Sequence, residues 1–154
     1  MARGNMGAHP ARRMAGRHLA VDLLSLSIER CRRTVPTPRR HGYIWVSGGP
    51  MNERLKAGTE ILAVAVDSKA DLQKMVDRIS KDDQKFPEFP FLSDRGHKVI
   101  NRYGLLNPAG RGWPHPATYV IDKKGIVRWK LVQVDYKVRS TNEQILEALR
   151  RIDE

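Results

Sequence analysis

The stretch that decides the fold is HPATYVIDKKGIVRWKLVQVDY, residues 115–136. It reads as two strands, 117–121 and 126–134, joined by the turn DKKG. Gly125 in this turn supplies the positive φ that such connections commonly need. Apolar and basic side chains alternate from Val127 to Leu131, so the second strand has one buried and one solvent-facing side. The pattern predicts an antiparallel hairpin.

Upstream of the hairpin, the chain alternates between strand and helix patterns. Residues 61–66 are six consecutive apolar residues, three of them β-branched, which predicts a parallel strand buried on both faces. Ser68 and Asp71 then have the spacing of a capping box. Residues 69–81 place apolar side chains at helical intervals, so we expect an amphipathic helix there.

The remaining elements complete an α/β order. A short strand is expected around residues 91–92, followed by a helix over 94–104 that Ser93 caps. Thr141 and Gln144 form a second capping box and open a terminal helix. The predicted order is strand, helix, strand, helix, hairpin and helix.

Basic residues divide the chain of 154 residues into two parts. Residues 1–50 hold nine arginines and no lysine against two acids, whereas residues 51–154 hold ten lysines, nine arginines and fifteen acids. We therefore expect residues 1–50 to be a basic, weakly ordered N-terminal extension and 51–154 to be the folded domain. An erroneous start or shifted reading frame, and a functional arm, are the alternatives for the first part.

The composition also limits compartment and partners. A single cysteine, Cys31, excludes an intrachain disulfide, and a reducing cytoplasm is the simpler location. Residues 18–28 resemble a signal peptide, but Asp22 interrupts them and no cleavage site follows. No membrane span is expected. Nucleic acid, metal and cofactor are not expected either, because the folded part lacks a stacking platform and the five histidines lack ligand spacing.

Four segments together resemble the second half of the redoxins, the alkyl hydroperoxide reductase/thiol-specific antioxidant group of peroxiredoxins and their thioredoxin-like relatives. The resemblance covers about residues 52–152 and implies a thioredoxin-like fold: a parallel unit, a C-terminal antiparallel hairpin and flanking helices. The first strand and the active-site helix are expected to be missing or degenerate. The four segments are EILAVAVDS (60–68), FPFLSDRGHKVINRYG (89–104), HPATYVIDKKGIVRWKLV (115–132) and DYKVRSTNEQILEAL (135–149).

The chemistry of the redoxins is attack of a cysteine thiolate on a peroxide, giving a sulfenic acid that another thiol resolves. Peroxiredoxins mark this cysteine with a Pro seven residues and a Thr three residues before it. Here Leu24 and Ile28 occupy those positions, and no second cysteine follows Cys31. Three flanking arginines still favour a thiolate, so Cys31 is the candidate catalytic residue.

The resemblance assigns further site residues around the start of the hairpin. Pro116 stands where peroxiredoxins have an arginine and where thioredoxin-like relatives have a cis proline, so we expect a cis His115–Pro116 bond. An ordinary trans proline at the start of a strand is the alternative. Thr118, Arg128 and Trp113 are the candidates to line the same site; a solvent-facing strand residue for Arg128 and a packed loop aromatic for Trp113 are the alternatives.

Two functions stay open. The resemblance implies a thiol-dependent antioxidant oxidoreductase that reduces peroxides or disulfides with electrons from thioredoxin or a small thiol, impaired here by the altered cysteine motif. The alternative is a non-catalytic or truncated thioredoxin-fold protein that acts as a binding module. Residues 43–50 bear on this choice, because they read as a strand and a glycine turn at the junction where the family keeps its cysteine.

Overall fold

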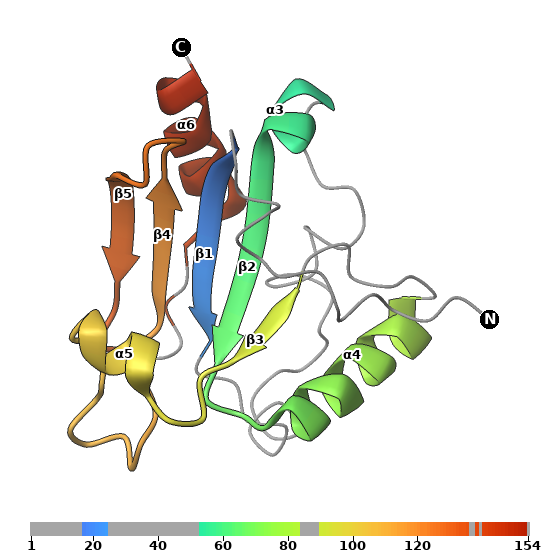
Figure 1. Ribbon diagram of the computed structural model, residues 1–154, viewed down its shortest axis with the longest axis vertical. Coiled ribbons are helices and arrows are strands. Elements are labelled where there is room, and N and C mark those ends of the chain that lie inside the picture. Colours follow the sequence, from blue (N-terminus) through green and yellow to red (C-terminus); the bar gives the residue numbers. More distant parts are fainter. Residues whose placement is uncertain (1–16, 25–52, 84–89, 136–137, 139, 154) are drawn as a thin grey trace.

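The fold is a five-stranded sheet with helices packed against both faces (Figure 1). It is seen in a computed structural model that describes residues 17–24, 53–83, 90–135, 138 and 140–153. The elements are β1 (His18–Leu24), α3 (Glu53–Gly58), β2 (Thr59–Ala65), α4 (Lys69–Asp83), β3 (Phe91–Ser93), α5 (Lys98–Arg102), β4 (Ala117–Ile121), β5 (Val127–Val132) and α6 (Asn142–Asp153). Among these helices, none is long and apolar enough to cross a membrane.

The strands lie in the order β3-β2-β1-β4-β5, which puts β1 at the centre of the sheet. β1 runs parallel to β2, with His18 opposite Thr59, and antiparallel to β4, with Leu23 opposite Ala117. The β2 strand was predicted as a parallel strand buried on both faces, and its burial fits that expectation, since Leu62 and the three residues after it are all buried.

The central position of β1 differs from the expectation of a weakly ordered extension over residues 1–50. Residues 18–24 belong to the sheet, because their backbone groups pair with two strands distant in sequence. A strand therefore fills the place that was expected to be missing or degenerate. The other strand expected in the N-terminal part, 43–47, lies outside the described residues, as does Cys31.

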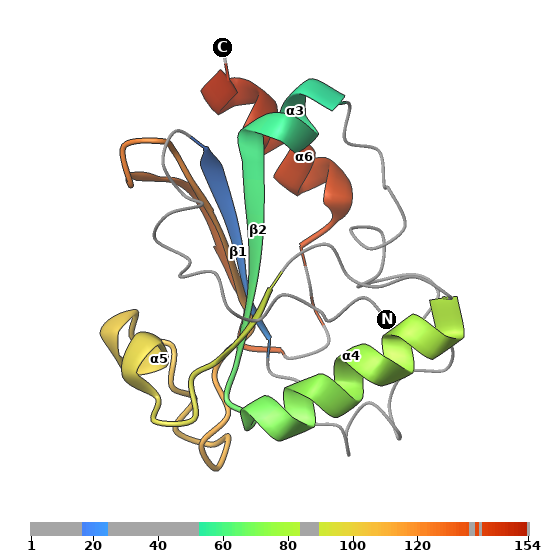
Figure 2. The ribbon, with the colours of Figure 1, turned by 45° about the vertical axis from the view of Figure 1, so that its right-hand side comes forward.

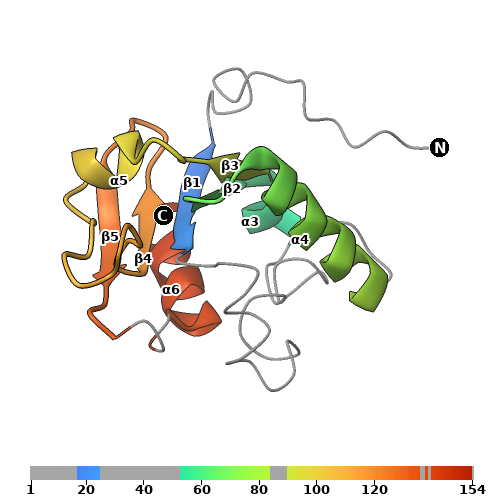
Figure 3. The same cartoon turned by 90° about the horizontal axis from the view of Figure 1, so that it is seen from below.

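One face of the sheet packs against α5 and the loop after it. Successive residues of a strand point to opposite faces, and Ala117 and Tyr119 of β4 point toward this side. Figures 2 and 3 show α5 on one side of the sheet and α6 on the other. The buried residues of this cluster are Val64, Ile100, Leu105, Ala117 and Tyr119.

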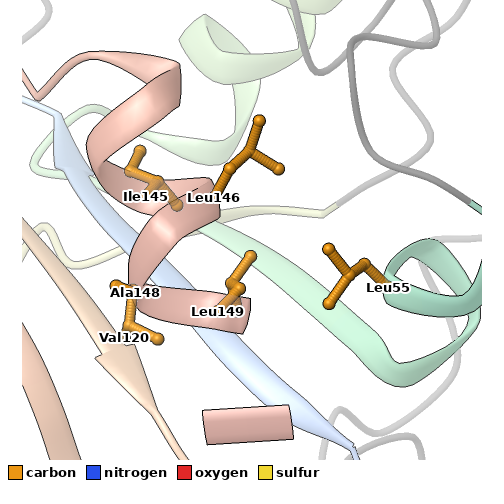
Figure 4. Packing of buried hydrophobic residues seen from close by; sticks show 6 residues of the cluster. All are labelled: Leu55, Val120, Ile145, Leu146, Ala148 and Leu149. Carbon is orange, nitrogen blue, oxygen red and sulfur yellow. The ribbon is translucent and has the colours of Figure 1, made fainter. Parts of the chain in front are cut away.

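The opposite face packs against α6 and α3. Val120 of β4 is fully buried beneath α6, and Leu55 of α3 closes the cluster from the side (Figure 4). The inner side of α6 faces this cluster, and Ile152 at the end of the helix is partly buried against it. The buried residues are Leu55, Val120, Ile145, Leu146, Ala148 and Leu149.

Both predicted capping boxes are confirmed. At α4, the Asp71 backbone N–H donates to Ser68 Oγ (3.2 Å), and the Ser68 hydroxyl donates to Asp71 Oδ2 (2.7 Å). At α6, the backbone N–H groups of Thr141 and Gln144 each donate to the side chain of the other, over 2.9 and 3.2 Å. These reciprocal bonds satisfy N–H groups that a helix start leaves without intrahelical partners.

The helix predicted over 94–104 is shorter and is capped differently. α5 has five residues, and the carboxylate of Asp94 accepts the N–H groups of Val99 (3.0 Å) and Ile100 (2.9 Å). Ser93 does not cap it, because its hydroxyl donates to the carbonyl of Asp67 (2.7 Å). Asp94 thus takes the role predicted for its neighbour.

The hairpin forms as predicted, with Gly125 at φ 81° in the turn. One detail of β5 differs from strict alternation. A register shift between Val120 and Ile121 turns Val127 toward solvent, whereas Trp129 and Leu131 are half-buried.

Candidate functional site

One edge of the sheet collects the carboxyl ends of the parallel strands and the start of β4. Leu24, the last residue of β1, lies opposite Ala65, the last residue of β2. Leu23 lies opposite Ala117, the first residue of β4. This edge is at the bottom of the sheet in Figure 1. Open α/β sheets bind ligands outside the carboxyl ends of their strands, so this edge is the candidate site.

Pro116 and Thr118 line a small hollow at this edge. Pro116 directly precedes β4 and Thr118 is the second residue of that strand, and both line the hollow. The hydroxyls of Thr118 and Ser140 lie 2.8 Å apart in a hydrogen bond. The hollow has a volume of about 10 Å³, which is room for about one water molecule. Its lining residues are Pro116, Ala117, Thr118, Leu131, Gln133, Val138 and Ser140.

The expected cis bond at Pro116 is wrong, because all peptide bonds in the described parts of the chain are trans. Pro116 is an ordinary proline at the start of a strand. Its carbonyl accepts the N–H of Gln133 (3.0 Å), while the preceding His115 N–H donates to the carbonyl of Leu105 (2.7 Å). The trans form is intrinsically the more stable one for an X–Pro bond by about 0.5–1 kcal/mol.

Trp113 belongs to the tight loop that leads into Pro116. Its carbonyl accepts the N–H of Asn107 (3.1 Å), and its own N–H donates to the carbonyl of Gly110 (3.1 Å). A Cβ at Gly110 would approach that Trp113 carbonyl oxygen to 2.9 Å, so the loop needs glycine there. Trp113 is partly buried in this loop rather than lining the hollow.

Arg128 lies at the other end of the hairpin. Its Nε donates to Asp122 Oδ2 over 2.7 Å beside the turn, whereas Thr118 pairs with Leu131 further along β5. The expectation that Arg128 lines the site with Thr118 is therefore wrong. Its role is to hold Asp122, which also accepts the backbone N–H groups of Lys124 and Ile126.

The candidate nucleophile, Cys31, is outside the described residues, but its distance along the chain from the site is short. Leu24 ends β1 beside Ala117, and Cys31 follows seven residues later. Seven residues can span at most about 25 Å. β1 thus ends at the edge that Pro116 and Thr118 occupy, seven residues before Cys31 in the sequence.

Two carboxylates also follow strands at this edge. Asp94 is buried, and its carboxylate already accepts two backbone N–H groups at the start of α5. Asp67 is half-buried, and its Oδ2 has no hydrogen-bond partner in the described part of the chain. Burial raises the pKa of Asp67, and the nearby Asp71 carboxylate adds to that rise. Within the described residues, no three acidic, histidine or cysteine side chains come together as a metal site.

Sequence reasoning missed the residues that close the hollow from outside β4. Ser140 contacts Thr118 although 22 residues separate them, and Val138 and Gln133 line the same space. The only local signal was a polar residue directly before the capping box at Thr141. A contact of this kind depends on how α6 returns to the sheet, which no short pattern shows.

Comparison with known proteins decides the family. The sequence profile of the AhpC/TSA family matches residues 51–130, slightly more than half of the chain. The chain belongs to the AhpC/TSA family. The resemblance drawn from the four segments is confirmed, and the chain is peroxiredoxin-like.

Two curated relatives each match part of this chain and part of their own length. A protein described as putative peroxiredoxin ycf42 from Trieres chinensis is 29% identical over 107 residues, covering 68% of this chain and 52% of the relative. Chloroplastic peroxiredoxin Q from Triticum aestivum is 32% identical over 74 residues, covering 48% of this chain and 31% of that protein. The chain thus spans about half the length of the first relative and about a third of the second.

Solved structures confirm the thioredoxin-like fold. AhpC of Mycobacterium tuberculosis superimposes with a TM-score of 0.72 at 19% identity, covering 92% of this chain and 72% of that one. AhpC of Enterococcus faecalis gives a TM-score of 0.70 at 14% identity, covering 91% and 77%. At these identities the similarity is one of fold.

Proposed function

We propose that this AhpC/TSA family member is a thiol-dependent peroxidase in which Cys31 is the reacting thiol, and that its turnover is slow. The observation that carries the proposal is the end of β1. Leu24 leaves the sheet at the edge formed by Pro116 and Thr118, seven residues before the one cysteine of the chain. Family membership supports the type of chemistry.

In the proposed reaction the Cys31 thiolate attacks one peroxide oxygen. The S–O bond forms as the O–O bond breaks, and protonation gives a sulfenic acid and an alcohol, or water from hydrogen peroxide. A first external thiol then displaces water to form a mixed disulfide with Cys31, and a second thiol releases Cys31 as a thiol. One peroxide is reduced for every two thiols oxidised.

Slow turnover follows from the residues around this chemistry. A single cysteine leaves no resolving thiol within the chain, so every cycle waits for external thiols. Pro116 stands where the family resemblance places an arginine that polarises the peroxide, and a proline has no hydrogen-bond donor for that task. Ile28, at the position of the family threonine, likewise offers no hydroxyl.

The test is consumption of hydrogen peroxide with dithiothreitol as the electron donor. The unsubstituted chain should consume peroxide slowly but above the rate of dithiothreitol alone, and Cys31→Ser should remove that excess. The matched control is the unsubstituted chain alkylated at Cys31 with iodoacetamide, which keeps the sequence and blocks the same sulfur. Equal rates for all three proteins would overturn the proposal.

The second candidate function is a non-catalytic binding module. It is favoured by the absence of a second, resolving cysteine from the sequence. It is also favoured by the loss of the Pro and Thr that mark the family's cysteine. Equal, background rates in the peroxide assay would support this alternative.

A further inference from the structure

Two tyrosine rings from different elements lie in contact on the α5 side of the sheet. Tyr103 is the C-cap of α5, and Tyr119 is in the middle of β4, sixteen positions further along the chain. Their ring centroids are 5.3 Å apart and their planes are tilted at 59°. This separation is within the range of about 4.5–7 Å at which aromatic rings contact each other. We call Tyr103 and Tyr119 the tyrosine pair.

Backbone hydrogen bonds hold both members of the tyrosine pair in place. Tyr119 lies opposite Val21 of β1 on one side and opposite Lys130 of β5 on the other. The Tyr103 N–H donates to the carbonyl of Val99 over 3.0 Å, which continues the hydrogen bonding of α5. Each ring therefore has a defined place beside the other.

The two rings differ in their access to solvent. Tyr103 is 44% exposed, whereas Tyr119 is 6% exposed and belongs to the buried cluster beneath α5. Burial raises the pKa of Tyr119, and its neighbour Tyr103 acts in the same direction, so Tyr119 is a neutral phenol at neutral pH. A dissolved oxidant thus reaches Tyr103 directly and reaches Tyr119 through the ring in contact with it.

We propose that the tyrosine pair is a site of oxidative crosslinking, where one-electron oxidants of the peroxyl radical class join Tyr103 to Tyr119 as dityrosine. Each of two peroxyl radicals removes a hydrogen atom from one phenol hydroxyl and becomes a hydroperoxide. The two tyrosyl radicals then form a C–C bond between ring carbons ortho to the hydroxyls. The hydrogen on each of those carbons moves to a phenolic oxygen, which restores both aromatic rings.

The geometry of the tyrosine pair suits this bond. Carbon atoms of side chains in contact lie about 3.5–4.0 Å apart, so a small shift brings two ring carbons to bonding distance. Tyr103 has room for that shift, because its side chain is nearly half exposed at the end of a five-residue helix. The hydroxyls beside the new bond crowd each other, so the two rings of dityrosine do not lie in one plane. The observed tilt of 59° fits that requirement.

The crosslink would fix α5 to the sheet. A covalent bond between Tyr103 and Tyr119 closes a loop that is present in the unfolded chain as well, and it restricts that chain as a disulfide does. The crosslinked protein should therefore have a higher melting temperature than the untreated protein. The closed loop contains Pro116, so the crosslink also restrains the segment that enters the candidate site.

An exposed tyrosine is also able to couple with a tyrosine of another molecule, which is the competing reaction. Groups that the fold already holds in contact react as if they were present at very high concentration. The bond within one chain should therefore be the main product when the protein is dilute. Its formation needs only the contact between Tyr103 and Tyr119 and the oxidant.

The test exposes the full chain, in dilute solution, to a water-soluble azo initiator that produces peroxyl radicals in air. The monomer is isolated by size-exclusion chromatography and examined by dityrosine fluorescence and by mass spectrometry after digestion. It should yield two linked peptides that join Tyr103 to Tyr119 and have lost two hydrogen atoms. The melting temperature of the crosslinked monomer is measured by circular dichroism.

Three variants identify the bond. Tyr103→Phe and Tyr119→Phe keep the rings and remove only a hydroxyl, and each should reduce the linked peptides to the level of untreated protein. Tyr43→Phe is the matched control, because it makes the same change at another tyrosine, and it should leave the linked peptides unchanged. Circular dichroism of each variant before oxidation checks that it is folded.

Four results would contradict the crosslinking site. These are oxidation of Tyr103 without linked peptides, dityrosine only between molecules, a bond from Tyr103 mainly to Tyr43 or Tyr136, and equal loss of signal in Tyr43→Phe and Tyr103→Phe. An unchanged melting temperature of the crosslinked monomer would contradict the expected effect on α5. The peroxide assay with dithiothreitol is independent of these results, because the crosslink does not use a cysteine.

Discussion

The side-chain hydroxyls of Thr118 and Ser140 form a hydrogen bond of 2.8 Å, which connects the segment before α6 to the strand beside Pro116. Thr118 is buried, at 5% exposed, and Ser140 is partly buried. The bond therefore closes one side of the hollow at the candidate site. It also links the position of α6 to the edge where β1 ends.

Removing the Thr118 hydroxyl tests the strength of this link. Thr118→Val keeps the shape of the side chain but leaves Ser140 without this partner, so we expect the free energy of unfolding in urea to fall by about 1 kcal/mol. Ser140→Ala should cost a similar amount. The double variant should lose clearly less than the sum of the two, because the shared bond is removed only once. Strict additivity would show that the two hydroxyls do not interact in solution.

A second prediction concerns the place of β1. Ala20 is 4% exposed, opposite Ile61 of β2 and Val120 of β4. Ala20→Glu would bury a charge at the centre of the sheet, which costs several kcal/mol. We expect loss of the cooperative thermal transition measured by circular dichroism. The control, Ala70→Glu, changes an exposed residue in the first turn of α4 and should alter stability by no more than about 0.5 kcal/mol. Equal, small effects would place residues 18–24 outside the sheet.

Elements with a short, local sequence pattern could be predicted, whereas elements that depend on distant partners could not. The strand at 61–66 was predicted from its run of apolar residues and the terminal helix from the capping box at Thr141, and the structure places β2 and α6 there. β1 was missed because Asp22 interrupts its apolar run and because its partners lie far along the chain, from Thr59 and from Ala117 onward. A short sequence pattern does not show which strands pair when they are far apart in the sequence.

The site was predictable to a similar extent. Pro116 and Thr118 both line the hollow before α6, because alternate residues of an extended segment share a face; their place in a functional site stays a prediction. Arg128 was misplaced because its position follows from the hairpin register and the shift near Val120. The α5 cap was assigned to Ser93 instead of the adjacent Asp94, and only the direction in which the chain leaves β3 decides between two such neighbours.

The third prediction concerns how Asp122 in the hairpin turn affects stability at acidic pH. The backbone N–H of Ile126, followed by the Arg128 guanidinium and the Lys124 N–H, lowers the pKa of Asp122 below its ordinary value of 3.8. A lowered pKa in the folded state stabilises the protein above pH 3.8, and that stability is lost as pH falls through the folded pKa. Asp122→Asn should therefore lower the melting temperature at pH 7 and lower it less at pH 3.5. An equal loss at both values would show that the charge of Asp122 contributes nothing.

Asp67 should behave in the opposite way, which is the fourth prediction. Burial raises the pKa of its carboxyl above 3.8, and the Asp71 charge acts in the same direction. The folded protein thus holds this proton more tightly than the unfolded chain. The resulting stability is present below pH 3.8 and is lost as pH rises through the folded pKa. Asp67→Asn, which cannot ionise, should raise the melting temperature more at pH 7 than at pH 3.5.

The two aspartate variants form an internal comparison, because each removes one carboxylate from a chain that is otherwise the same. Their melting temperatures, relative to the unsubstituted protein at each pH, should diverge as pH rises from 3.5 to 7. The divergence has a structural cause: Asp122 accepts three donors in the turn, whereas Asp67 Oδ2 is buried without a partner in the described part of the chain. If Asp67→Asn instead destabilised the protein more at pH 7 than at pH 3.5, the carboxylate would have a partner at the candidate site, and the account of its raised pKa would be wrong.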